Sequence, residues 1–193
     1  MDLSRIRLLV CDVDGVLTDG TVTVDDLGRE SCRYSKRDGV LLPAMKEAGI
    51  DVVAMTAEAL AGLRVGEDGT LRPGFNVHHN RCNKLGIALH TCAPDYKLDA
   101  LRSIAESYEV PLSEVAYIGD DLPDLPCLEA VAEAGGFAVV PDRSAAWYAA
   151  ARSGFIVHRY EGLTGGDGVL RAVCASLLTA RGYDCNRWPV VKR

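Results

Sequence analysis

Short apolar segments recur along the chain, and each ends in acidic, glycine or other turn-forming residues. Such segments are typical of strands that are buried on both faces of a sheet. The predicted strands span residues 6–11, 50–55, 85–89, 115–118, 137–140 and 155–157. Segments between them have apolar residues three or four positions apart, which is the period of a helix. The predicted helices span residues 38–49, 97–108, 124–134, 144–152 and 169–179.

Strands that alternate with helices predict an α/β fold with a doubly wound parallel sheet, because each crossover places a helix on one face of the sheet. The helices then cover both faces, and the fold has three layers. With 193 residues, the chain suits one domain, residues 1–193, whose core needs neither a metal nor disulfide bonds.

Three segments depart from this alternation. Residues 21–34 contain two β-prone stretches around a turn at 25–28, which predicts a β-hairpin that projects from the sheet. Residues 62–80 hold several glycines and a proline without any period, which predicts an atypical loop at the rim of the site. Residues 181–193 form a tail without periodicity.

The charge and the apolar pattern argue against two kinds of partner. Lys and Arg number 21 against 27 Asp and Glu, so the net charge is -6, and the basic residues are scattered rather than gathered into a stripe that would suit nucleic acid. No apolar run reaches the length that spans a membrane, and the first residues lack the apolar core of a signal peptide. Seven cysteines without CxxC spacing fit reduced thiols. We therefore expect a soluble, cytoplasmic protein.

The segment DVDGVLTDG, residues 12–20, directly follows the first predicted strand. Ligands of open α/β sheets bind at the carboxyl ends of the strands. Two carboxylates two positions apart, Asp12 and Asp14, can divide the work on a phosphate: one attacks or binds a metal, and the other moves a proton. A DxDG segment without other motifs is also found in ordinary loops rich in Asp and Gly.

Other candidate residues follow later strands. Thr56 comes after the second strand, Lys97 begins a helix, and an acidic group follows the strand at 115–118. Singly, such residues serve as helix caps, solvated lysines or turns. Together they lie at one edge of the predicted sheet, where a metal ion, a fixed cation and neutral donors would offset the charge of a phosphate dianion. The set therefore predicts a phosphoryl-transfer site.

These motifs, in this order, resemble those of the haloacid dehalogenase (HAD) superfamily of phosphohydrolases. DVDGVLTDG is similar to the first motif of its uncapped sugar-acid phosphatases, a group that includes 3-deoxy-manno-octulosonate 8-phosphate phosphatase. The resemblance covers residues 6–178 apart from the loop at 62–80. It implies that Mg²⁺ is held by Asp12, the main-chain carbonyl of Asp14 and Asp120.

The resemblance also implies catalytic roles. Asp12 would attack phosphorus and form an aspartyl-phosphate. Asp14 would protonate the leaving sugar oxygen and later deprotonate the water that cleaves the acyl phosphate. Thr56 would donate its hydroxyl hydrogen, and Lys97 its ammonium charge, to the transferring phosphoryl group.

Two acidic residues, Asp121 and Asp124, are alternatives for holding Lys97 and a metal-bound water in place. The stretches between Asp14 and Thr56 and between Lys97 and Asp120 are too short for a cap domain. Uncapped members of the superfamily close the site by assembling into tetramers in which the projecting hairpin of one subunit covers the next. The resemblance therefore implies a homotetramer.

Further matches concern the sugar end of the substrate. Arg37 and Asp38 lie in a segment that resembles the one before the family's first helix. Arg171 follows a glycine-rich turn, residues 165–168, that lines the sugar site in relatives. Asp167 stands in that turn where many relatives have Arg, so the substrate contact of this turn is open.

The identity of the sugar acid depends on two positions. Relatives that act on the eight-carbon acid usually carry Gly-Arg after the motif threonine, whereas this chain has Ala57 and Glu58. Glu58 with Lys84 is similar to the pair in relatives that act on nine-carbon 2-keto-3-deoxy acids of the sialic-acid type. We therefore expect a nonulosonate 9-phosphate phosphatase, with 3-deoxy-D-manno-octulosonate 8-phosphate as the alternative substrate. A surface Glu and a solvated Lys without any substrate role would give the same pattern.

Two other classes of protein stay open at this point. One is a phosphatase-like domain without activity, against which the intact motif residues argue. The other is a phospho-acceptor signalling domain, which also uses Asp, Thr and Lys on a doubly wound sheet but has its acidic pair on a different strand. Turnover of an aryl phosphate with Mg²⁺ separates the enzyme from both.

Overall fold

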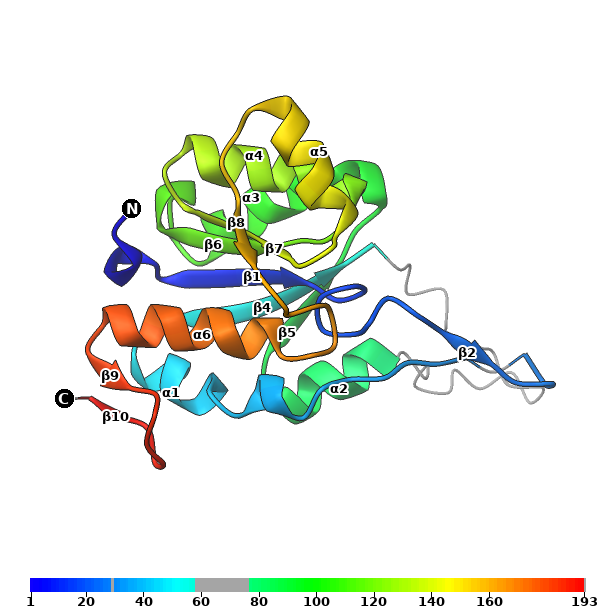
Figure 1. Cartoon of the computed structure of the whole chain (residues 1–193), viewed down its shortest axis with the longest axis horizontal. Helices are drawn as coiled ribbons and strands as arrows, with labels where there is room; N and C mark the ends of the chain where they lie inside the picture. The colour runs from blue at the N-terminus through cyan, green and yellow to red at the C-terminus, as the bar shows by residue number, and fades with distance from the viewer. Residues whose placement is uncertain (29, 58–76, 193) are drawn as a thin grey trace.

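The computed structural model describes residues 1–28, 30–57 and 77–192. Six parallel strands form one sheet in the order β5-β4-β1-β6-β7-β8 (Figure 1). Its strands are β1 (Leu8–Asp12), β4 (Asp51–Thr56), β5 (Ala88–Thr91), β6 (Val115–Ile118), β7 (Phe137–Pro141) and β8 (His158–Tyr160). The predicted doubly wound parallel sheet is confirmed.

Helices cover both faces of this sheet, as the three-layer prediction requires (Figure 1). One layer contains α1 (Leu42–Glu47), α2 (Val77–Leu85) and α6 (Val169–Ala180). The opposite layer contains α3 (Lys97–Ser107), α4 (Leu125–Glu133) and α5 (Ala145–Ser153). The predicted projecting hairpin is also present: β2 (Thr23–Val24) pairs with β3 (Glu30–Ser31) away from the main sheet.

The core divides into two clusters because successive side chains of a strand point to opposite faces. From β1, Leu9 and Cys11 pack toward α1 and α6, whereas Leu8 and Val10 pack toward α3 and α4. Every residue of β1 is buried. Burying one such leucine contributes about 1.5–3 kcal/mol, so β1 anchors whatever its carboxyl end presents.

The order of the strands places a crevice at the carboxyl end of β1. The chain passes from β1 to β4 and β5 on one side, then crosses back to β6 on the other side of β1. Such a reversal of strand order leaves the carboxyl ends open between two diverging connections, and ligands bind there. Asp12, the last residue of β1, lies opposite Met55 of β4 at this point.

Several predicted boundaries were wrong, each for a local reason. The helix predicted from residue 38 begins at Leu42, because residues Arg37–Gly39 form a short 3₁₀ turn and Pro43 suits the first turn of a helix. The strand predicted at 85–89 begins at Ala88, because Leu85 ends α2.

Two further corrections concern the ends of the sheet and of the chain. The strand predicted at 155–157 lies at His158–Tyr160; Phe155 and Val157 pack against the core from the segment before it. The predicted tail is not irregular throughout, since β9 (Tyr183–Asp184) pairs with β10 (Val191–Lys192). Of the loop predicted at 62–80, the last residues are helical because α2 begins at Val77, and the remainder lies outside the described residues.

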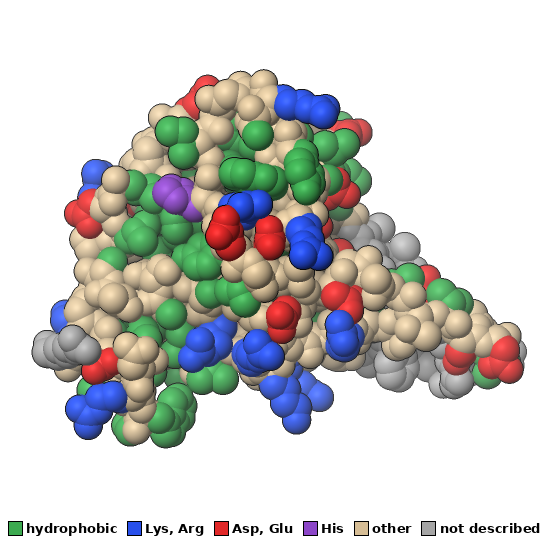
Figure 2. Space-filling view, viewed as in Figure 1, with side chains coloured by type: hydrophobic (Ala, Val, Ile, Leu, Met, Phe, Trp, Pro, Cys, Tyr) green, Lys and Arg blue, Asp and Glu red, His purple; other side chains and the backbone are tan. Residues whose placement is uncertain are grey.

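The distribution of surface charge and the lengths of the helices indicate which kinds of partner the protein suits. Figure 2 shows basic and acidic side chains interspersed across one face of the molecule. Among the described residues, no helix is both long enough and apolar enough to cross a bilayer.

Candidate active site

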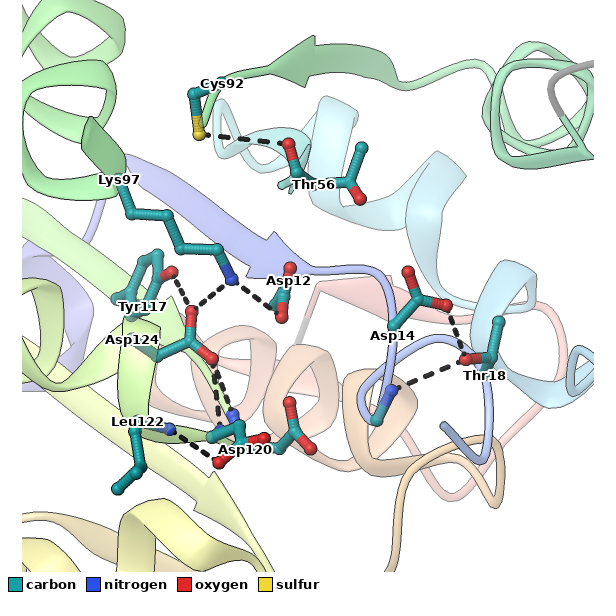
Figure 3. Close-up of polar contacts among 12 residues, drawn as sticks. Asp12, Asp14, Thr18, Thr56, Cys92, Lys97, Tyr117, Asp120, Leu122 and Asp124 are labelled. Carbon is teal, nitrogen blue, oxygen red and sulfur yellow. Dashed lines mark hydrogen bonds and ion pairs between the residues drawn. The ribbon is translucent and has the colours of Figure 1, made fainter. Parts of the chain in front are cut away.

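A buried ion-pair network lies at the carboxyl end of β1. The Lys97 Nζ lies 2.9 Å from Asp12 Oδ2 and 2.7 Å from Asp124 Oδ1. All three side chains are less than a tenth exposed. Figure 3 shows the lysine reaching from the start of α3 to a position between the two carboxylates. Three elements distant in sequence thus converge on one point of the sheet edge.

Asp124 orders the loop that follows β6. Its Oδ1 accepts hydrogen bonds from Lys97 Nζ and from the Tyr117 hydroxyl, both at 2.7 Å. Its Oδ2 accepts from the backbone N–H groups of Asp120 and Asp121, at 3.1 and 3.2 Å. The side chain of Asp121, in contrast, is exposed and accepts from the N–H of Leu122. Of the two alternatives left open by the sequence, Asp124 is the residue in contact with Lys97.

The site concentrates negative charge away from water. Carboxylate oxygens of Asp12, Asp120 and Asp124 all lie within 4.8 Å of one another. Burial and the neighbouring Asp124 charge raise the pKa of Asp12 well above its usual range. Burial, with the charges of Asp124 and Asp121, raises the pKa of Asp120 to about 7. The single Lys97 ammonium does not offset three carboxylates, so a divalent cation fits this donor set.

This electrostatic arrangement predicts how stability changes with pH. The pKa of Asp120 is about 7 in the folded protein, whereas the ordinary pKa of an aspartate side chain is 3.8. Between these values only the folded state keeps the proton, so the free energy of unfolding falls as the pH rises. Without divalent cations, we expect the melting temperature to fall between about pH 4 and pH 7, and saturating Mg²⁺ to remove most of that fall. Asp120→Asn, measured by calorimetry, should show a smaller fall; an unchanged fall would contradict this assignment.

Gly15 brings the first loop against Asp120. Its φ is +78°, and a Cβ at this position would lie 1.9 Å from Asp120 Oδ2. Only glycine therefore lets the Asp12–Asp14 backbone approach the carboxylate so closely.

Replacing this glycine should damage the site more than the fold. We expect Gly15→Ala to raise the Mg²⁺ concentration for half-maximal activity at least about tenfold, because displacing Asp120 costs on the order of 1.4 kcal/mol in cation binding. Gly135→Ala is the matched control: its φ is +84° and nothing lies within 4 Å of the added Cβ. Both variants should lose similar stability from backbone strain, about 1–2 kcal/mol. Equal Mg²⁺ requirements in the two variants would contradict the prediction.

Asp14 belongs to a second group of contacts. Thr18 Oγ1 donates to Asp14 Oδ1 at 3.1 Å, and His78 Nε2 lies 3.3 Å from Asp14 Oδ2. Burial raises the pKa of Asp14, but the contacts with His78 and Thr18 outweigh it and hold the pKa below its usual value. Figure 3 shows the Asp14 side chain set apart from the Asp12–Lys97 pair and facing Thr18.

Two residues in this arrangement escaped the sequence analysis. His78, on α2, is 2% exposed and contacts both Asp14 and the hydroxyl of Tyr34. It lies in a segment that the pattern assigned to a loop, so nothing marked it. Tyr117 is fully buried in β6 and donates to Asp124. A tyrosine in an otherwise apolar strand was a usable signal, because a buried hydroxyl needs a partner.

The glycine-rich turn supports the loop after β1. The Gly166 N–H donates to the carbonyl of Val16 at 3.0 Å. A Cβ on Gly165 would lie 2.0 Å from the Gly15 carbonyl oxygen. Thr56, at the carboxyl end of β4, is 1% exposed and completes the same edge of the sheet.

The predicted sugar-binding residues are only partly brought together. Arg37 Nη1 lies 3.3 Å from Asp167 Oδ1, and both side chains are more than half exposed. Asp38 is buried, and its Oδ1 accepts from the N–H of Arg171 at the start of α6. Lys84 is exposed in the last turn of α2, whereas His78 reaches Asp14 from the first turn. Glu58 lies outside the described residues.

The chain is similar to several characterised proteins. No protein-family model matches it. The 3-deoxy-D-manno-octulosonate 8-phosphate phosphatase of Salmonella typhi is 33% identical over 178 residues, covering 92% of this chain and 82% of that protein. The phosphatase of that name from Moraxella catarrhalis, solved with magnesium, phosphate and KDO, has a TM-score of 0.72 at 29% identity, over 93% of this chain and 89% of that one. The cobalt-bound phosphatase of Haemophilus influenzae has a TM-score of 0.74 at 26% identity, over 94% and 92%.

The three-layer fold and the acidic edge of the sheet define a hydrolase of the HAD type. The chain belongs to the HAD superfamily, in the group of sugar-acid phosphatases that resemble 3-deoxy-D-manno-octulosonate 8-phosphate phosphatase. It is a phosphatase, that is, a hydrolase of phosphoric monoesters. The family and the class of enzyme predicted from the sequence motifs are confirmed.

Proposed function

We propose that the chain is a Mg²⁺-dependent phosphatase of 3-deoxy-D-manno-octulosonate 8-phosphate. The observation that carries this proposal is the buried acidic cluster around Lys97, in a chain whose curated relatives bear this activity in their names. The eight-carbon acid was the alternative in the sequence-based prediction, and the relatives support it better than the nine-carbon acid. A cytoplasmic location remains a prediction.

Mg²⁺ suits the site because it prefers oxygen ligands. Asp12, Asp120 and the main-chain carbonyl of Asp14 would hold it. When bound, it supplies positive charge that offsets the charge of the transferring phosphoryl group. Lys97 supplies a fixed positive charge beside it, and burial between Asp12 and Asp124 keeps the ammonium in one position. Thr56 would donate its hydroxyl hydrogen to a phosphoryl oxygen.

Asp12 would act as the nucleophile. Its carboxylate attacks phosphorus, the bond to the sugar oxygen breaks, and an aspartyl-phosphate forms. Lys97, 2.9 Å away, favours the ionised carboxylate and opposes part of the rise in the pKa of Asp12 that burial and the Asp124 charge cause. A water then cleaves the acyl phosphate and regenerates the carboxylate.

Asp14 would move the protons in both steps. His78 and Thr18 favour its ionised form, which is the form that accepts a proton from the attacking water. For the first step Asp14 must carry a proton. An arriving phosphate dianion favours the protonated form, because a like charge nearby raises the pKa of a carboxyl group.

The sugar end of the substrate would lie near the glycine-rich turn. Arg37 and Arg171 are the basic candidates there for the carboxylate of the sugar acid. Asp38, being buried, would serve by ordering the first turn of α6 rather than by contacting substrate. Glu58 and Lys84 are the pair that would favour a nine-carbon acid instead.

The ratio of specificity constants for the two sugar phosphates tests the substrate. We expect kcat/KM for the octulosonate 8-phosphate to exceed that for a nonulosonate 9-phosphate at least tenfold, about 1.4 kcal/mol in the transition state. The reverse preference would show that the nine-carbon acid phosphate is the substrate. Hydrolysis of an aryl phosphate in the same preparation shows whether the catalytic site works, independently of sugar preference.

We also propose a homotetramer in which the β2–β3 hairpin covers a neighbouring site. Val22, Val24 and Leu27 on this hairpin are 55%, 57% and 70% exposed. Apolar residues on a projecting element are typical of a surface that another chain covers. Light scattering at micromolar concentration should give the mass of four chains, and a monomer would contradict the proposal.

A further inference from the structure

A second cluster of potential metal ligands lies on the other side of Asp14. A carboxylate oxygen of Asp14, the Sγ of Cys32 and a ring nitrogen of His78 all lie within 4.8 Å of one another. The three come from the first loop, the end of the hairpin and the first turn of α2. This cluster is distinct in chemistry from the Asp12–Asp120–Asp124 cluster, which offers only oxygen.

The ligand types select the kind of ion. A thiolate and an imidazole favour Zn²⁺, whereas Mg²⁺ prefers oxygen ligands. In a tetrahedral zinc site with bonds of about 2.0–2.3 Å, neighbouring ligand atoms lie about 3.3–3.8 Å apart. His78 Nε2 and Asp14 Oδ2 are 3.3 Å apart, so these two atoms already have that spacing. Three protein ligands leave the fourth position for water.

The surroundings of the cluster hold its ligands in place. His78 is 2% exposed, and its Nδ1 contacts the Tyr34 hydroxyl. A metal-bound histidine commonly makes such a bond through its other nitrogen. The Asp14 oxygen that does not face His78 accepts from Thr18. The Arg81 side chain binds the Ser35 carbonyl at 2.7 Å and lies over the Tyr34 ring, which fastens α2 to the segment after the hairpin.

We propose that Asp14, Cys32 and His78 form an inhibitory Zn²⁺ site that occupies the proton-transfer carboxylate. On binding, the Cys32 thiol releases its proton to water. Bound through Nε2, neutral His78 carries its one proton on Nδ1 and donates it to the Tyr34 oxygen. The inhibitory consequence rests on the proposed role of Asp14, whereas the binding of zinc does not. Mg²⁺ would remain bound at the first cluster, because the ligands there are different atoms.

Cobalt spectroscopy tests the site without reference to activity. Added to the protein, Co²⁺ should produce an intense near-ultraviolet thiolate-to-metal band, and Zn²⁺ should remove it. Cys32→Ser and Cys32→Ala should abolish the band. Cys92→Ser is the matched control, since Cys92 is also half-buried and lies next to the first cluster, near Lys97 and Asp12. A missing wild-type band, or a band lost in Cys92→Ser and kept in Cys32→Ser, would overturn the proposal.

Inhibition tests the consequence. At saturating Mg²⁺, micromolar Zn²⁺ should slow hydrolysis of an aryl phosphate, and a chelator should reverse the effect. Cys32→Ser should keep the zinc-free turnover number and require at least tenfold more Zn²⁺ for half inhibition. Equal inhibition of the variant would place zinc at the Mg²⁺ cluster and refute the inhibitory role. A protein without turnover but with the Cys32-dependent band would instead refute the proposed function and leave the zinc site standing.

Discussion

Asp12→Asn is expected to abolish phosphatase turnover. An amide does not attack phosphorus as a carboxylate does, and loss of a nucleophile lowers turnover by as much as about 10⁶-fold in well-studied hydrolases. We expect the variant to retain less than about 10⁻⁴ of wild-type kcat with an aryl phosphate and saturating Mg²⁺. The covalent phosphate that acid quenching should trap on the wild-type enzyme is expected to be missing from this variant.

The fold of this variant should survive, which makes the loss interpretable. Asn has the shape of Asp, and the substitution removes one of three clustered carboxylates while Lys97 keeps its 2.7 Å contact with Asp124. The melting temperature without divalent cations should therefore match or exceed that of the wild type. Asp51→Asn, at the exposed amino end of β4, is the control and should keep full activity. Appreciable turnover by Asp12→Asn would show that another group is the nucleophile.

Asp14→Asn should have the second largest effect, through proton transfer. Removing a general acid–base group lowers kcat by about 10²- to 10⁴-fold. The half-maximal Mg²⁺ concentration should stay close to that of the wild type, because Asp14 would offer the ion only its main-chain carbonyl. Turnover near the wild-type value would show that the acid–base assignment is wrong.

The leaving group provides a sharper test of Asp14. An aryl phosphate with an acidic leaving group does not need protonation in the first step, whereas a sugar phosphate does. In rapid-mixing experiments, Asp14→Asn should release one equivalent of aryl alcohol in a burst and then turn over slowly, since the water of the second step still lacks its base. Absence of a burst would place the whole defect in the first step.

The motif residues were predictable because the ends of buried strands can be identified from the sequence. The apolar run before Asp12 and the one before Gly119 each identify a buried strand, and parallel strands present their carboxyl ends at one edge. Asp12 and Asp120 were therefore expected at the same edge of the sheet, and the observed strand order makes their strands neighbours. The boundaries were less certain where polar residues form an element, as in His158–Tyr160 of β8.

Contacts between segments that are distant in the sequence could not be predicted from the sequence in the same way. Whether Asp121 or Asp124 reaches Lys97 depends on the turn after β6. In this turn the Asp124 carboxylate accepts hydrogen bonds from two backbone N–H groups, whereas Asp121 caps the turn. His78 and Asp14 are 64 positions apart in the sequence (78 − 14). They come into contact only because α2 packs beside the first loop. Cys32 joins them through the hairpin.

The sequence by itself determined the class of fold, the edge of the sheet that carries the chemistry and the residue types available there, because hydrophobic period and strand-end motifs are local properties. Only the tertiary structure decided which of these groups touch and which are shielded from water. The raised pKa of Asp120, the pairing of Lys97 with Asp124 and the grouping of Asp14, Cys32 and His78 all depend on distances between separate elements. Coulombic and hydrogen-bond energies change steeply over an ångström or two, a scale that sequence spacing does not specify.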